Sequence, residues 1–106
     1  MHVATNTHLI TDFHRAEDGK DEKIGTTRRG NGPAYRDKYA RKGVRAMDDP
    51  RLQPYIISMY HELYENEEYN EIEILFEGAQ GFGLDIDWGD YPYVTSSHCT
   101  VGGAIL

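Results

Sequence analysis

Two segments of this 106-residue chain concentrate residues that can bind a polar or anionic ligand. The first, GTTRRGNGPAYRDKYARKG at residues 25–43, combines glycines, two threonines and several arginines and lysines. Glycine lets backbone amides approach an anion closely, and threonine hydroxyls can donate to phosphate oxygens. We therefore expect Thr26, Thr27 and Gly30 to contact a phosphate group. Positive charge would come from Arg28, Arg29, Arg36, Lys38, Arg41 and Arg45.

Positive charge is confined to one part of an acidic chain, whose formal net charge is −7. Residues 20–45 hold nine Lys or Arg against three Asp or Glu, and the remainder holds two against fifteen. The overall acidity argues against a nucleic-acid-binding protein, and the local excess indicates one anionic ligand at one place. A basic loop exposed to solvent would have the same composition, so the residues alone leave both interpretations open.

The second segment is FEGAQGFGLDIDWGDYPYVTSSHCTVGG at residues 76–103. The amide of Gln80 can donate and accept hydrogen bonds at once, which suits the edge of a base or a phosphate. Further side-chain donors are Thr95, Ser96, Ser97 and Thr100. A hydrogen-bonded turn region would explain the same residues. Asp85 and Asp87 form a D-x-D pattern, but two acids in a loop are more often solvated or structural, so we assign no metal ligand.

The elements around the first segment are predicted from its flanks. Residues 8–18 are expected to form an extended entry followed by a helical turn. Pro33 suits the first position of a short helix, because its missing N–H is not needed there. That helix is expected to run to about Lys42 and to end at Gly43.

The elements before the second segment predict a helix and then a strand. Asp48 and Asp49 can cap a helix over residues 50–66, whose apolar residues recur at a spacing of three and four. Residues 72–78, IEILFEG, alternate in polarity and stop at a glycine, which is typical of a strand ending in a loop. The expected fold class is therefore α/β, and ligands gather at such strand ends.

Length and composition favour one small domain in a reducing compartment. The single cysteine, Cys99, excludes an internal disulfide. No apolar run approaches eighteen residues, and the first residues lack the basic head and apolar core of a secretory signal. We expect a cytoplasmic protein, in the host cytoplasm if phage-encoded, with no membrane or nucleic-acid partner.

Both segments resemble conserved blocks of the adenylosuccinate synthetase family. Residues 25–43 resemble its motif of Gly-Thr-Thr followed by G-I-G-P-x-Y-x-x-K-x-x-R, with Asn31 in place of the usual isoleucine. The matching residues are Gly30, Gly32, Pro33, Tyr35, Lys38 and Arg41. Residues 76–103 resemble the second block, and residues 8–18 resemble the segment that precedes the first. The resemblance implies a central piece of the synthetase fold, with sheet strands, short helices and glycine-rich ligand loops.

The resemblance also implies an activity. Family members are ligases of purine biosynthesis that join L-aspartate to IMP, with GTP and Mg²⁺ as cofactors, through a 6-phosphoryl intermediate. By position in the motifs, Thr27, Gln80 and Thr95 would bind IMP. Arg41 would reach across a homodimer interface to the phosphate of the neighbouring subunit's nucleotide, and Lys38 is the candidate catalytic residue.

The chain departs from the family pattern in what it lacks. The GDEGKGK motif with its catalytic aspartate and magnesium loop, the catalytic histidine, the arginine loop for aspartate and the guanine site are not found in it. None of its five histidines lies in a matching context. We therefore expect residues 1–106 to be a single partial domain from the middle of the enzyme. Alone it should be inactive, marginally stable or self-associating, with the main ligands of GTP and Mg²⁺ elsewhere.

Three alternatives remain open on the sequence. Only 53 positions separate Thr27 from Gln80, which resembles compact archaeal and phage forms, some of which act on dGMP. A small nucleotide- or RNA-binding module could use residues 20–45, with Tyr35 and Tyr39 as stacking surfaces. A non-catalytic interaction domain could use the tyrosine-rich residues 50–66.

Overall fold

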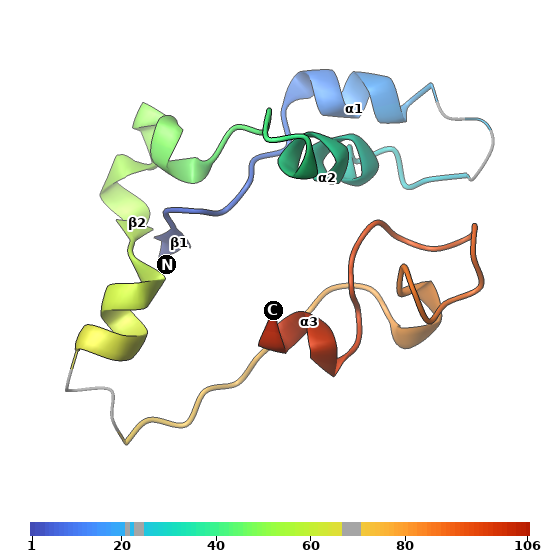
Figure 1. The fold of residues 1–106 in the computed structure, drawn as a ribbon. Helices are drawn as coiled ribbons and strands as arrows, with labels where there is room; N and C mark the ends of the chain where they lie inside the picture. Colours follow the sequence, from blue (N-terminus) through green and yellow to red (C-terminus); the bar gives the residue numbers. More distant parts are fainter. Residues whose placement is uncertain (21, 23–24, 67–70) are drawn as a thin grey trace.

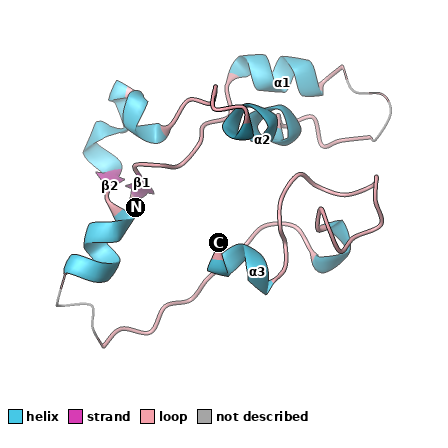
Figure 2. Cartoon of the chain, in the orientation of Figure 1, coloured by secondary structure: helices cyan, strands magenta, loops and turns pink. Residues whose placement is uncertain are grey.

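The computed structural model describes residues 1–20, 22, 25–66 and 71–106, so Asp21, Lys23 and Ile24 of the basic stretch lie outside the described residues. The element order is β1 (Val3–Ala4), α1 (Asp12–Asp18), α2 (Asn31–Tyr39), η1 (Ala46–Asp48), η2 (Pro50–Tyr55), β2 (Ile56–Ile57), η3 (His61–Glu65), η5 (Phe82–Leu84) and α3 (Val101–Ile105). η3 is a single π-helical turn, and η1, η2 and η5 are 3-10 helices. Figure 2 shows that long loops connect these short elements.

The α/β class is confirmed by a small parallel sheet and short helices. β1 and β2 pair in parallel, with Val3 opposite Ile56 and Ala4 opposite Ile57. After β1 the chain runs beside residues 44–47: the N–H of Leu9 donates to the carbonyl of Val44 at 2.8 Å, and that of Ala46 to Thr7 at 2.7 Å. Ala46 is fully buried at this crossing.

The prediction of an extended entry and a helix over residues 8–18 is confirmed. Thr11 caps α1, because its hydroxyl accepts the N–H of His14 while the His14 ring accepts the N–H of Thr11. In Figure 1, α1 lies against α2, and the loop between these helices carries the Gly-Thr-Thr sequence. The fold therefore holds both ends of this loop on packed helices.

The predicted bounds of α2 were wrong at both ends. The helix begins at Asn31, two residues before Pro33, because Gly30 takes a left-handed conformation with φ 89° at the N-cap. It ends at Tyr39 because Arg41, not Gly43, takes the left-handed conformation, with φ 62°. The N–H groups of Lys42 and Gly43 then both donate to the carbonyl of Asp37.

The predicted helix over residues 50–66 was also wrong. Pro54 has no N–H to give an α-helix, and the chain forms the 3-10 helix η2 instead. Ile56 and Ile57 then pair with β1, since branched side chains favour strands. The apolar spacing does not produce one buried face, because Tyr55, Met59, Tyr60, Leu63 and Tyr64 are all exposed.

The predicted strand over residues 72–78 was wrong as well. The segment has no regular secondary structure, and Leu75 and Phe76 are exposed at 93% and 65%. A strand requires a hydrogen-bonded neighbour, and the one sheet among the described residues consists of β1 and β2 alone. Figure 1 shows this stretch as an extended connection to the part that holds η5 and α3.

The described chain is open rather than close-packed. Its radius of gyration is 15.9 Å, whereas a compact domain of this length has about 13 Å. Its accessible area is 8868 Å², against about 6,000 Å² expected for this mass. Among the described residues, no helix has both the length and the apolar character needed to span a bilayer. The open shape leaves a space in which the two glycine-rich segments face each other.

Candidate functional site

A cavity of about 600 Å³ lies between the two glycine-rich segments. One wall consists of Gly25, Thr26 and Thr27 with the start of α2, and the other consists of Gln80, Leu84 and residues 93–96. The cavity therefore brings together Thr27, Gln80 and Thr95, which are far apart in the sequence.

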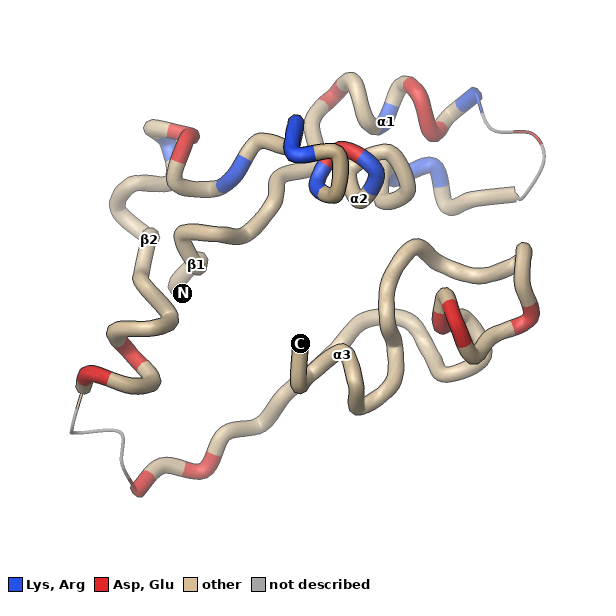
Figure 3. Tube along the Cα trace, viewed as in Figure 1, with Lys and Arg blue, Asp and Glu red and all other residues tan. Residues whose placement is uncertain are grey.

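The N-terminus of α2 opens into this cavity through Asn31, Gly32 and Pro33. The first N–H groups of a helix have no partner within the helix, and its dipole attracts negative charge. A Cβ added to Gly32 would lie 3.6 Å from the hydroxyl oxygen of Ser96, so the helix start and the second segment are close neighbours. Figure 3 shows lysines and arginines along α2, and acids around the second segment. The helix end is therefore the natural place for an anion.

Asp18, the last residue of α1, organises the loop beside the cavity. It is 5% exposed, and its two oxygens accept the Thr26 hydroxyl and the Gly30 N–H, each at 2.9 Å. The Thr26 hydroxyl in turn accepts the N–H of Arg28 at 3.1 Å. The expected phosphate contacts from Thr26 and Gly30 are thus already engaged within the protein. No hydrogen bond among the described residues engages the Thr27 hydroxyl.

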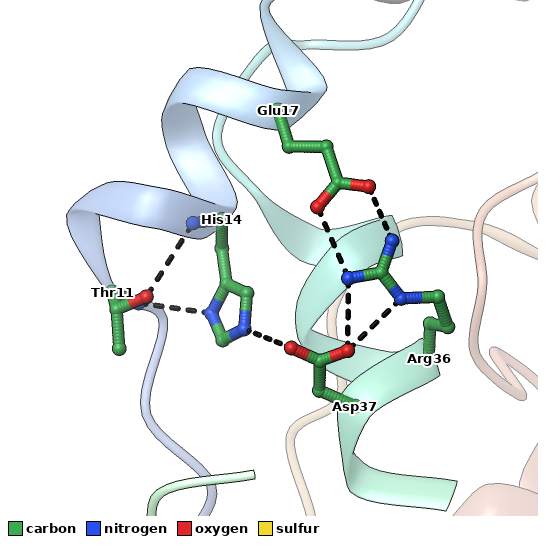
Figure 4. Close-up of polar contacts among 5 residues, drawn as sticks. All are labelled: Thr11, His14, Glu17, Arg36 and Asp37. Carbon is green, nitrogen blue, oxygen red and sulfur yellow. Dashed lines mark hydrogen bonds and ion pairs between the residues drawn. The ribbon is translucent and has the colours of Figure 1, made fainter. Parts of the chain in front are cut away.

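A polar network joins α1 to α2 next to the cavity (Figure 4). Arg36 donates two hydrogen bonds to the carboxylate of Glu17 and also pairs with Asp37. The pKa of Glu17 is therefore below its ordinary value, and the pKa of Arg36 is raised. Hydrogen bonds from His14 and then Arg36 lower the pKa of Asp37. The cation of Arg36 serves this network, and it balances a carboxylate that would otherwise repel an anion.

Asp85 shapes the second segment from within. Its side chain is fully buried and accepts four backbone N–H groups, those of Asp87 at 2.9 Å, Trp88 at 3.1 Å, Cys99 at 2.6 Å and Thr100 at 3.3 Å. Burial raises the pKa of Asp85, but the four donors outweigh it, so this pKa lies below the ordinary value. The loop so held sets the position of Thr95, whose N–H donates to Leu84 at 2.8 Å.

Asp85, Asp87 and His98 place three possible metal-ligand atoms within 4.8 Å of one another. Magnesium requires carboxylate oxygens that are available for coordination. Both oxygens of Asp85 are taken by backbone donors, so this group does not fit a magnesium site. Asp85 therefore has a structural role, and we assign no magnesium ligand to this cluster.

Lys38 and Arg41 lie away from the 600 Å³ cavity. The Lys38 ammonium lies 5.8 Å from the ring centroid of Tyr35 and 5.6 Å from that of Tyr39. It borders a second cavity, of about 580 Å³, that Asp87 and His98 also line. Arg41 is exposed beyond the end of α2. The structure therefore separates these two predicted site residues from Thr27, Gln80 and Thr95.

Sequence reasoning missed Asp18. Its role depends on residues 26–30 folding back onto the end of α1, and no local sequence pattern predicts that contact. The one available signal was an acid at the end of a helix that precedes a loop rich in donors.

The family model and the similar proteins all match this chain to one family, along nearly its whole length. The family model for adenylosuccinate synthetase matches residues 1–50 and 49–106. The adenylosuccinate synthetase of Carboxydothermus hydrogenoformans is 37% identical, and the match covers 100% of this chain and 36% of the relative. Those of Symbiobacterium thermophilum and Chlorobium limicola are each 36% identical, covering 100% and 98% of this chain. The chain spans about a third of the length of these relatives.

The alignments also show a difference in length. The alignment to the Carboxydothermus protein runs over 154 residues, whereas this chain has 106, so the relative carries about 48 residues more. The two stretches matched by the family model meet at residues 49–50, between η1 and η2, and we infer that the additional residues lie at this junction. Apart from this segment, both glycine-rich blocks and the helices that position them fall inside the matched stretches, and the chain belongs to the adenylosuccinate synthetase family.

Proposed function

We propose that this chain supplies the nucleotide-binding part of a cytoplasmic ligase of purine biosynthesis that joins L-aspartate to IMP with hydrolysis of GTP. The observation that carries the proposal is the meeting of Thr27, Gln80 and Thr95 at one cavity, beside the N-terminus of α2. The names of the relatives support the same reaction, because each is an adenylosuccinate synthetase.

Each of the three residues has a role that its chemistry allows. The Thr27 hydroxyl and the first N–H groups of α2 would donate to the IMP phosphate. Gln80 would bind the polar edge of the purine, and Thr95 would donate a directional hydrogen bond from the facing loop. Gln80 has a φ of 70°, a conformation rarely adopted by residues other than glycine, and such strain is found where a site requires it.

In this proposal GTP and Mg²⁺ have a role separate from that of the chain. GTP would supply the phosphoryl group that activates the 6-oxygen of the purine, and Mg²⁺ would assist that transfer. We assign neither cofactor a ligand among the described residues. The chain's own contribution is to bind and orient IMP.

A homodimer would explain the position of Arg41. The residue does not line the cavity that holds Thr27, so a contact with a nucleotide requires a second copy of the chain. The left-handed backbone at Arg41 directs the chain away from α2, and the side chain is exposed. Lys38, the candidate catalytic residue, lies on the same helix and would belong to this interface region.

The test is an amide NMR titration of the 106-residue chain with IMP and, in a second arm, with dGMP. We expect shifts confined to residues 25–34, 80–84 and 93–96. Thr27→Val should weaken IMP binding about tenfold, because one hydrogen bond to a charged group is lost. Thr7→Val makes the same change outside the cavity and should have no effect. The absence of shifts with both nucleotides would overturn the proposal. Tighter binding of dGMP than of IMP would instead show that the substrate is dGMP, as in some phage members of the family.

A further inference from the structure

We infer that Asp18 is a positioning residue for the phosphate site: its carboxylate holds residues 26–30 in the conformation that presents Thr27 and the α2 N-terminus to a phosphate. This inference rests on the proposed function, since it assigns that site the side chain that shapes it. Asp18 carries negative charge at the rim of an anion site, where the charge alone would weaken binding. Its presence there therefore calls for a structural reason.

Two hydrogen bonds provide that reason. The carboxylate of Asp18 accepts the Thr26 hydroxyl and the Gly30 N–H at 2.9 Å each, from the two ends of the same loop. The side chain is 5% exposed, so solvent does not replace these bonds. A single rigid carboxylate thus fixes the separation of Thr26 and Gly30. Thr27 lies between them and lines the cavity, and its hydroxyl has no hydrogen-bond partner among the described residues.

The direction of the Thr26 hydroxyl is also set by Asp18. Because its proton goes to Asp18, its oxygen is left to accept the N–H of Arg28. Arg28 has a φ of 57°, which an arginine rarely adopts, and the bond to Thr26 stabilises that backbone. The tight turn after Thr27 therefore depends on a chain of contacts that begins at Asp18.

The close approach of Gly30 to α1 completes the arrangement. A Cβ at Gly30 would lie 2.8 Å from the Ile10 side chain and 3.0 Å from the backbone of Arg15. The Gly30 backbone thus lies directly on α1, where the Asp18 carboxylate reaches its N–H. Since Gly30 is the N-cap of α2, the same bond fixes the position of the helix end that would face the phosphate.

The test compares IMP with inosine, which lacks the phosphate, in the full 106-residue chain. Asp18→Asn keeps the shape of the side chain but turns an N–H₂ group toward one of the two donors. We expect it to weaken IMP binding about tenfold and to leave inosine binding unchanged. Asp12→Asn makes the same chemical change on the same helix, at an exposed residue that does not contact the loop, and should bind both ligands normally.

A partner series and a ligand-free readout complete the test. Thr26→Val should reproduce the loss seen with Asp18→Asn, and Thr26→Ser should restore binding. Without any ligand, amide exchange at Gly30 should become at least tenfold faster in Asp18→Asn, while exchange within α2 stays unchanged. Equal loss of IMP and inosine binding, or an unchanged Gly30 exchange rate, would overturn the inference. If the unmodified chain binds no IMP, the proposed function fails, and the exchange rate alone decides whether Asp18 positions the loop.

Discussion

The Nε2–H of His14 donates to Oδ2 of Asp37 at 3.0 Å, and this bond joins the first turn of α1 to the last turn of α2. The other ring nitrogen, Nδ1, accepts the N–H of Thr11 at 3.0 Å. One buried imidazole therefore completes the cap of α1 and holds α2. Figure 4 shows this contact between the two helices. The loop that joins the helices carries Thr27, so the contact helps to hold that loop from outside the cavity.

The Asp37 contact predicts sensitivity of the fold to acid. The bonds from His14 and Arg36 hold the pKa of Asp37 below 3.8, the value expected in the unfolded chain. The unfolded state therefore binds more protons as the pH falls, and the stability that Asp37 contributes is present above about pH 4 and is lost as the pH falls through the folded-state pKa. The sign is the same for Glu17, Asp49 and Asp85, whose pKa values are also lowered.

The measurement is the urea midpoint of unfolding between pH 3 and pH 6. We expect the midpoint of the unmodified chain to fall as the pH decreases below 4, and Asp37→Asn to show a shallower fall from a lower starting value. Asp12→Asn, which removes an exposed carboxylate, should keep the original slope. An Asp37→Asn variant with the original slope would show that the bonds from His14 and Arg36 to Asp37 do not couple folding to protonation.

Gly25 and Gly30 allow the cost of a left-handed backbone to be measured separately from the cost of a steric clash. Both Gly25 and Gly30 have left-handed conformations, with φ of 68° and 89°. No atom lies within 4 Å of a Cβ at Gly25, whereas a Cβ at Gly30 would meet Ile10 and the backbone of α1. Gly25→Ala should therefore cost about 1 kcal/mol of unfolding free energy from the left-handed conformation alone. Gly30→Ala should cost this amount and a further 1–3 kcal/mol, about that of an overpacked site.

Urea unfolding of the two variants provides the comparison. Equal losses would mean that the loop moves away from α1 at no cost. In that case the close packing of Gly30 on α1 would not contribute to stability.

Of the two acids in the D-x-D pattern, we expect only Asp85 to be needed for the order of its loop and for IMP binding. Asp85→Asn places an N–H₂ group against backbone donors that the carboxylate now accepts, so the loop over residues 82–100 should lose its order. IMP binding should weaken at least tenfold because Thr95 is positioned by this loop, whereas the α1–α2 amides keep their chemical shifts. Asp87→Asn changes an exposed carboxylate and should retain binding. Equal effects of the two variants would contradict this prediction and would indicate that both carboxylates share one role, such as metal binding.

The parts of the fold that the sequence predicted were those controlled by local rules. The helical turn within residues 8–18 depends on residues within one turn of one another. The α/β class is correct, but the helix over 50–66 and the strand over 72–78 from which it was predicted do not form. The residue types of the two glycine-rich blocks left structural explanations open, and only the family resemblance implied that both blocks bind one ligand. Their meeting at one cavity was predicted through the resemblance and not through any local pattern.

The errors have a common physical cause, which is pairing between distant segments. Ile56 fits an apolar helical spacing, but the pairing of Ile56 and Ile57 with Val3 and Ala4 decides their conformation. Residues 72–78 have the alternation of a strand but no neighbour to pair with among the described residues. The end of α2 depends on the left-handed backbone of Arg41, a conformation for which glycine is the usual choice. Asp18 was missed for the same reason, since its partners lie in a loop that folds back.

The junction at residues 49–50 predicts where the chain tolerates added length. We infer that the 48 or so additional residues of related synthetases lie at this junction, where Asp49 is half-buried and Pro50 is exposed. A ten-residue Gly/Ser segment inserted between Asp49 and Pro50 lengthens the loop closed by β1 and β2 from about 50 to about 60 residues. By the logarithmic dependence of loop entropy, the added length should cost only a few tenths of a kcal/mol. Separating Asp49 from η2 removes its cap and its hydrogen bonds to Arg51, which should cost about 1 kcal/mol more. The same segment inserted between Ala46 and Met47 should be far more disruptive, because Ala46 is fully buried and both residues donate backbone hydrogen bonds to residues 5–7. Urea midpoints of the two insertion variants decide the matter: equal losses would show that the 49–50 junction is as tightly held as the crossing at Ala46, and that the additional segment of the relatives requires compensation elsewhere.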